Sequence, residues 1–185
     1  MKNTVYISYY GPINASTAKA VMDTCSNVVA QAGPSRLYFL FSSIGGSVDA
    51  GMALYGFLRG LPVPLVMHNT GSVDSVANVV FLAADERYAS PHSMFLLHGV
   101  TWGFVQGAQL TWTQMRETVS RFRADEERMC SVITSRTAIG RDDLTALFHQ
   151  GQTKDLAFAK EKGLIQEIVE PKIQSGHTLI TLSFV

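Results

Sequence analysis

A strongly apolar segment in the middle of the chain constrains the fold most. Residues 76–84, VANVVFLAA, follow Ser75 directly and are typical of a helix that is apolar on every side. Because a helix without a polar face must be surrounded by protein, we expect this one to lie in the core. The run is far too short to cross a bilayer, so we predict no membrane-spanning segment.

Three strand and helix alternations along the chain predict an α/β fold with a parallel sheet that is covered on its faces. Val5–Tyr9 is the first predicted strand, and a helix with Val21 and Cys25 on its apolar face begins near Ala15. The remaining elements follow in chain order: a strand over 36–41, a helix through Leu58, a strand over 65–68, a turn over 69–74, short strands at 88–89 and 94–97, a long helix over 111–137, short helices over 141–147 and 154–162, a strand over 164–169 and an edge strand over 178–185.

Composition narrows the class of protein further. The 185 residues suit one domain over 1–185, and the 15 basic and 15 acidic residues cancel, which excludes a basic nucleic-acid binder. Near-zero net charge with 46% hydrophobic residues favours a homo-oligomer. Cys25 and Cys130 are expected to be buried reduced thiols. With no secretory signal at the start of the chain, we expect a cytoplasmic location.

Two turns that precede predicted helices are candidates for a catalytic site, one with paired glycines and one with a serine. At Gly45 and Gly46 the absence of side chains lets backbone N–H groups approach a ligand closely. At Ser75 a hydroxyl stands where the N–H groups of a helix start would favour a developing negative charge. Taken alone, each pattern is typical of something simpler: a tight turn for the glycines and an N-cap for Ser75.

His98 ends a short apolar strand, where α/β proteins often place functional groups, although such a histidine is more often structural. The other four histidines have no mutual metal-ligand spacing, so we read them as solvated or packing residues and predict no metal site. They are His68, His92, His149 and His177.

Read in order, three segments resemble the proteolytic subunit of the Clp protease family. FSSIGGSVDAGMALY at residues 41–55 is similar to the family's paired-glycine segment. GSVDSVA at residues 71–77 is similar to the segment around its catalytic serine, and PHSMFLLH at residues 91–98 to the run that ends in its catalytic histidine. The resemblance extends from about Tyr6 to Val169.

This resemblance implies a crotonase-like α/β spiral of parallel strands and helices, with a handle region at about residues 103–150. It implies that Ser75 is the nucleophile of a serine peptidase and His98 its general base. The N–H groups of Gly46 and Val76 would form the oxyanion hole. It also implies self-association into heptameric rings, stacked in pairs around a chamber in which peptides are hydrolysed.

The chain departs from the family at two places. Gly151 falls where the family has the aspartate that orients the histidine, and a glycine cannot hold an imidazole. The candidates near that position to replace the aspartate are His149, Gln150, Gln152 and Asp155. The family's N-terminal axial loops have essentially no counterpart, so there is little reason to expect coupling to an ATPase unfoldase.

Three hypotheses follow for the activity. The first is a peptidase that uses Ser75 and His98 and needs no cofactor. The second, favoured by Gly151, is a catalytically weak or silent ring subunit that scaffolds or regulates an active paralogue. The third is an acyl-CoA enzyme of the related crotonase fold, although such an enzyme does not require Ser75 and His98 at these places.

Overall fold

The computed structural model describes residues 3–184 except 102, 104, 105 and 108, so the predicted end of the last strand at Val185 and part of the predicted handle region lie outside it. The described strands form one sheet in the order β6-β5-β3-β2-β1-β8, with β4 paired to β3 and β7 to β4. The strands are β1 Thr4–Tyr10, β2 Arg36–Ser43, β3 Leu65–Asp74, β4 Glu86–Ala89, β5 Met94–Leu96, β6 Thr153–Lys154, β7 Glu167–Ile168 and β8 Thr178–Ser183. The helices are α1 Ala15–Ala32, α2 Val48–Arg59, α3 Ala77–Phe81, α4 Trp112–Arg136, α5 Arg141–Gln150 and α6 Leu156–Glu161.

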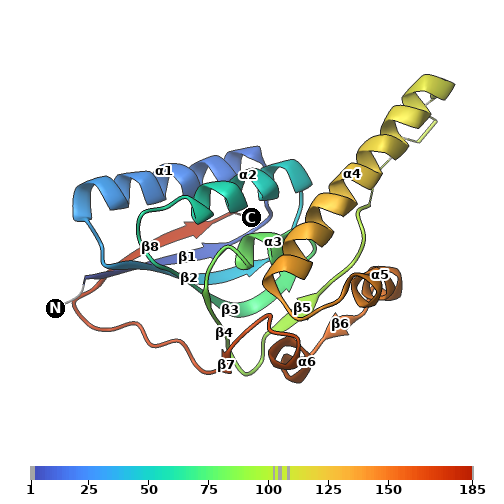
Figure 1. The fold of residues 1–185 in the computed structure, drawn as a ribbon. Helices are drawn as coiled ribbons and strands as arrows, with labels where there is room; N and C mark the ends of the chain where they lie inside the picture. The colour runs from blue at the N-terminus through green and yellow to red at the C-terminus, as the bar shows by residue number, and fades with distance from the viewer. Residues whose placement is uncertain (1–2, 102, 104–105, 108, 185) are drawn as a thin grey trace.

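The arrangement confirms the predicted α/β class. Helices α1 and α2 lie together over the strands β8, β1 and β2 (Figure 1), and all pairs in the centre of the sheet are parallel. An asparagine cap begins α1, because the Asn14 side chain accepts from the Thr17 amide while Thr17 Oγ1 accepts from the Asn14 amide. The buried side of α1 carries Val21 and Cys25, as its periodicity predicts.

Segment 76–84 lies in the core as predicted, with every side chain at most 2% exposed. The turn predicted over 69–74 is wrong, because β3 continues as a strand to Asp74. Its first half pairs with β4 and its second half, Ser72–Asp74, pairs with β5. Strands β4 and then β5 supply hydrogen-bond partners for the backbone of this stretch. It therefore stays extended despite the turn-like composition around Gly71.

Helix α4 is packed at one end and free at the other. Met129 and Ile133 are buried in the core, whereas Met115 and Val119, on the same predicted seam, are 47% and 46% exposed. The N-terminal half of α4 therefore projects away from the sheet (Figure 1), as a handle would. No helix among the described residues is long and apolar enough to span a membrane. Both cysteines are free and buried, as predicted.

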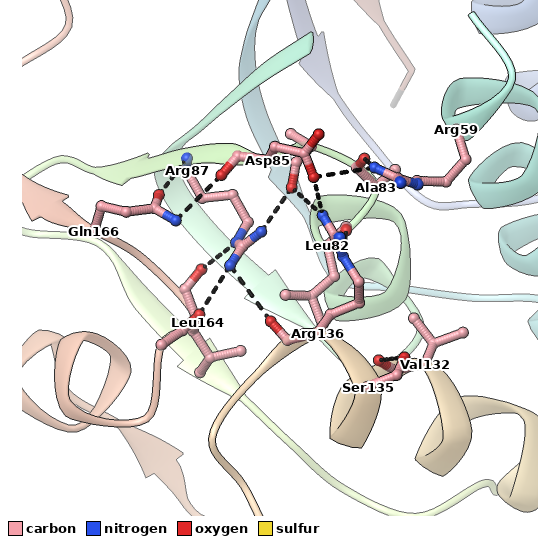
Figure 2. A network of polar contacts seen from close by, with 12 residues as sticks. Arg59, Leu82, Ala83, Asp85, Arg87, Val132, Ser135, Arg136, Leu164 and Gln166 are labelled. Atoms are coloured by element: carbon pink, nitrogen blue, oxygen red, sulfur yellow. Dashed lines mark hydrogen bonds and ion pairs between the residues drawn. The ribbon is translucent and has the colours of Figure 1, made fainter. Parts of the chain in front are cut away.

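A buried arginine joins elements far apart in the sequence. Arg87 on β4 donates from Nε to Leu164 O at 2.8 Å, from Nη1 to Ala84 O at 2.6 Å and from Nη2 to Gly163 O at 3.0 Å (Figure 2). Nη2 also lies 3.4 Å from Arg136 O at the end of α4. Burial lowers the pKa of Arg87 to about 10, and the nearby positive charge of Arg136 contributes. One guanidinium thus satisfies carbonyl groups from three separate segments.

His68 on β3 is fully buried and bonded to neutral groups, in agreement with the prediction that it is a packing residue. The Tyr38 hydroxyl lies 2.7 Å from its Nδ1 and Ser90 Oγ lies 3.3 Å from its Nε2. Burial lowers the pKa of His68 below its ordinary value of 6.5, since the charged imidazolium would lose its hydration.

This shift predicts that acid destabilises the fold. Below pH 6.5 the unfolded chain binds a proton at His68 that the folded chain does not, so the free energy of unfolding falls as pH decreases. The slope from this one group is at most about 1.4 kcal/mol per pH unit. Denaturant titrations between pH 7 and pH 5 should show a smaller slope for His68→Gln, whereas His92→Gln, at an exposed turn, should keep the wild-type slope. Equal slopes for all three proteins would contradict the assignment.

Candidate active site

Ser75 stands at the junction between β3 and α3 in a conformation that L-amino acids seldom adopt. Its φ is 57°, the one positive φ at a non-glycine residue among those described. A non-glycine residue in the left-handed region costs about 1–2 kcal/mol, and such strain is found most often at functional sites. The sharp bend leaves the Ser75 side chain half-exposed although α3, which follows, is buried.

The paired glycines are closely packed, Gly45 against Ser75 and Gly46 against Ile13. A Cβ on Gly45 would approach the Ser75 Cβ to 2.7 Å, and a Cβ on Gly46 would approach Ile13 O to 2.2 Å. Ile13 forms a parallel bridge here, donating to Gly45 O and accepting from the Ser47 amide, both at 2.8 Å. In such a bridge the N–H of the middle residue points to the other side. The Gly46 amide is therefore directed away from Ile13 and can serve a ligand.

Backbone pairing brings the Ser75 turn next to the strand that leads to His98. Asp74 pairs with Leu96, and the Ser75 amide donates to Leu96 O at 2.9 Å. His98 follows two residues later. Val76, whose amide is the second predicted oxyanion donor, is the N-cap of α3, where the first N–H groups have no partner within the helix.

The His98 ring has a defined tautomer. Its Nδ1 lies 2.7 Å from the carbonyl oxygen of Gly99, and because a carbonyl oxygen only accepts, Nδ1 must carry the proton. In a neutral ring with this tautomer, Nε2 is the nitrogen that can accept a proton, as a general base must. Gly99 is thus a positioning contact that the sequence reading missed, since nothing in a sequence marks a main-chain acceptor.

Extending the register of the sheet beyond its last observed pair would bring Gly151 opposite His98. Strand β6 runs antiparallel to β5, with Phe95 paired to Lys154 and Leu96 to Thr153. Continuing this register by two residues in each strand sets Gly151 across from His98, at the end of α5. A Cβ on Gly151 would meet nothing within 4 Å. The position where we expect the family's aspartate therefore has open space around it.

The predicted substitutes for the aspartate are engaged elsewhere or exposed. Asp155 is the N-cap of α6 and accepts from the Phe158 amide at 2.9 Å. Gln150 accepts from Lys154 Nζ at 3.0 Å, Gln152 is exposed, and His149 lines a surface pocket between α4 and α5.

Asn78 is a second residue that the sequence reading missed. Its buried side chain donates from Nδ2 to Ser75 O at 3.0 Å and to Leu96 O at 2.9 Å, which ties the nucleophile turn to β5. Its Oδ1 is buried without a partner among the described residues. The available signal was that Asn78 is the one polar side chain in the apolar run 76–84.

A pocket of about 330 Å³ opens beside these groups. Its walls include Gly46 and Ser75 together with apolar and charged side chains from α2, α4 and the loop after β5. The other lining residues are Ser47, Val48, Asp49, Val100, Thr101, Arg121 and Asp125. Among the described residues there is no cluster of three or more histidine, cysteine or acidic side chains that could hold a metal ion.

The sequence was also compared with those of known proteins. A sequence model of the Clp protease family matches residues 1–172, most of the chain. The chain belongs to the Clp protease family. Its elements are those expected of this family from the motifs at residues 41–55, 71–77 and 91–98, so the Clp protease assignment agrees with the α/β fold observed.

Curated relatives of this Clp protease family chain have modest identity. The subunit named ATP-dependent Clp protease proteolytic subunit 2 is 27% identical in Pseudomonas aeruginosa over 129 residues, 69% of this chain and 63% of that protein. The protein of the same name in Treponema denticola is 29% identical over 98 residues, 52% and 49% of the two chains. In Borreliella burgdorferi it is 26% identical over 140 residues, 75% and 69%. The chain thus spans about half to two-thirds of the length of these relatives.

Proposed function

We propose that this chain is a serine peptidase that hydrolyses peptides with Ser75 as nucleophile and His98 as general base. The observation that carries the proposal is the strained Ser75, held against the paired glycines and bonded through its amide to the strand that leads to His98. Membership of the Clp protease family supports the same reaction class.

The reaction would follow from these groups in order. Ser75 Oγ attacks the carbonyl carbon of the peptide bond while its proton passes to His98 Nε2. The Gly46 and Val76 N–H groups donate to the oxyanion of the tetrahedral intermediate. When the intermediate collapses, the C–N bond breaks and the leaving amine takes the proton from Nε2. Water then hydrolyses the acyl-enzyme by the same steps and restores Ser75.

The neutral partner of His98 predicts slow turnover. The Gly99 carbonyl fixes the tautomer, but it carries no charge to stabilise the imidazolium that forms during attack. Replacing the carboxylate of a serine triad by an uncharged amide lowers turnover by about 10⁴-fold. We therefore expect a peptidase that is measurably active and much slower than one with a complete triad.

Assembly into rings is part of the proposal. The free half of α4 carries exposed Trp112, Met115 and Val119 along one side, where a second copy of the chain can bury them. Such an association would enclose the site in a chamber, as the family resemblance implies. Sedimentation of the purified chain measures this directly.

A fluorophosphonate probe tests the nucleophile. Wild-type protein should be labelled covalently, and Ser75→Ala should not be labelled, because the probe reacts only with an activated hydroxyl. Ser72→Ala, on the same strand but paired through its hydroxyl to Asp74, is the matched control and should label like wild type. Equal labelling of wild type and Ser75→Ala, or none in either, would contradict the proposal.

The open space at Gly151 favours a second candidate, a silent ring subunit that supports an active paralogue. In that case the purified chain would remain unlabelled and would co-purify with a second subunit that labels. Labelling of the isolated chain at Ser75 excludes this candidate.

A further inference from the structure

A cluster of four charged side chains borders the pocket beside Ser75. Asp49 lies in the first turn of α2, and Arg121, Asp125 and Arg128 lie on α4. We call these four residues the charged cluster. Three of them, Asp49, Arg121 and Asp125, line the pocket together with Gly46 and Ser75. Charged groups therefore stand in the space that a substrate side chain next to the reacting bond would enter.

Each carboxylate oxygen of the charged cluster already faces a guanidinium nitrogen. Arg128 Nη1 lies 3.0 Å from both Asp49 Oδ1 and Asp125 Oδ1. Arg121 Nη2 donates to Asp49 Oδ2, and Arg121 Nε lies 3.9 Å from Asp125 Oδ2. Hydrogen bonding to Asp49 raises the pKa of Arg128, which remains charged. An incoming ammonium group would thus have to displace an existing ion pair.

The two arginines, unlike the two aspartates, have hydrogen-bonding groups that the charged cluster does not use. A guanidinium carries five N–H donors, and the contacts within the charged cluster use one nitrogen of Arg128 and two of Arg121. Arg121 lines the pocket and its side chain is 55% exposed, so its remaining donors can reach a ligand. Arg128 keeps Asp49 and Asp125 paired when Arg121 turns towards that ligand. The surplus of donors matches a carboxylate, which accepts from a guanidinium in bidentate geometry.

We propose that the charged cluster is a substrate subsite that binds an acidic side chain adjacent to the bond attacked by Ser75, with Arg121 as the residue that determines this specificity. The inference rests on the peptidase function proposed above and names the class of peptide that the site prefers. Asp125, one turn further along α4, restrains Arg121 before the substrate arrives, so that less side-chain entropy is lost on binding.

Three fluorogenic peptides that differ only at the residue next to the cleaved bond test the proposal. They carry Glu, its neutral isostere Gln, or Lys at that position. We expect the wild-type kcat/KM to be at least tenfold higher for the Glu peptide than for the Gln peptide, and lowest for the Lys peptide. The ratio should fall with added salt, because Arg121 is partly exposed.

Two substitutions in the charged cluster should change this ratio in opposite directions. Arg121→Gln should bring the Glu to Gln ratio close to one, and Asp49→Asn should raise it, because Arg121 loses a competing carboxylate. Arg141→Gln is the matched control: Arg141 pairs with Glu127 and its side chain is 51% exposed, but it lies outside this pocket, so the ratio should stay at the wild-type value. An unchanged ratio in Arg121→Gln, or a wild-type preference for Lys, would overturn the proposal.

A binding measurement separates this proposal from the peptidase function. The Ser75→Ala protein cannot complete the reaction, so fluorescence anisotropy of labelled Glu and Gln peptides reports the subsite alone. Tighter binding of the Glu peptide, lost on adding Arg121→Gln, supports the subsite even if wild-type protein hydrolyses nothing. Equal binding of the two peptides refutes the subsite even if Ser75 proves to be an active nucleophile.

Discussion

Gly151→Asp is expected to raise kcat for peptide hydrolysis by about 100-fold or more. The register of β5 and β6 sets position 151 across from His98, and a Cβ there would meet no atom within 4 Å. An aspartate would offer His98 a charged acceptor in place of the neutral Gly99 carbonyl, and such a carboxylate contributes up to about 10⁴-fold in a complete triad. Gly151 has a φ of 57°, a conformation that aspartate and asparagine tolerate better than other side chains.

Gly151→Asn is the matched control for this prediction. Asparagine has the same size and the same tolerance of the left-handed conformation, but it carries no charge to stabilise an imidazolium. Steady-state hydrolysis of one fluorogenic peptide by wild type and both variants measures the effect, with thermal melting to verify folding. If the Asp variant is no faster than the Asn variant, position 151 is not within reach of the His98 ring.

Arg87→Met is expected to lower the free energy of unfolding by about 2–5 kcal/mol, because buried carbonyl groups lose the charged donor that satisfies them. The substitution leaves the buried Leu164 and Gly163 carbonyl groups without a donor, whereas Ala84 O keeps its hydrogen bond from Arg136 Nη2 at 3.0 Å. Each unsatisfied buried carbonyl costs about 1–3 kcal/mol, although local shifts and entering water recover part of it. The contacts of Arg87 join β4 to the end of α4 and to the segment after α6 (Figure 2), so these segments should loosen together.

Arg36→Met provides the comparison for Arg87→Met. Arg36 also lies on a strand, but it is partly exposed and its ion pair with Glu86 spans 3.9 Å, so its loss should cost less than about 1 kcal/mol. Arg87→Lys should fall between the two, since lysine keeps the charge but lacks the planar fork. Urea titrations at pH 7 measure all three variants, and similar losses for Arg87→Met and Arg36→Met would refute the role assigned to Arg87.

The periodicity of apolar residues predicted the fold class better than it predicted where each helix and strand ends. The apolar run 76–84, the stripe of α1 and the C-terminal half of the α4 stripe are properties of neighbouring residues, and the structure buries them as predicted. The stretch 69–74 does not follow its turn-like composition, because β4 and β5 are available to pair with it. Strand pairing depends on residues far apart in the sequence. Predictions from local composition therefore fail most readily at short polar segments that contain a glycine.

The sequence alone determined which chemical groups are available: a serine at the start of an apolar helix, a histidine at a strand end, a pair of glycines, and a glycine at residue 151, where the resemblance predicts an aspartate. Only the tertiary structure decided what surrounds them. The register of β6 against β5, the contact of His98 with the Gly99 carbonyl, and the meeting of Asp49 with Arg121 across 72 residues of chain all depend on how distant segments pack. Local sequence specifies backbone conformation within a few residues, whereas distances between side chains of separate elements are fixed when the sheet and its helices bury their apolar faces together.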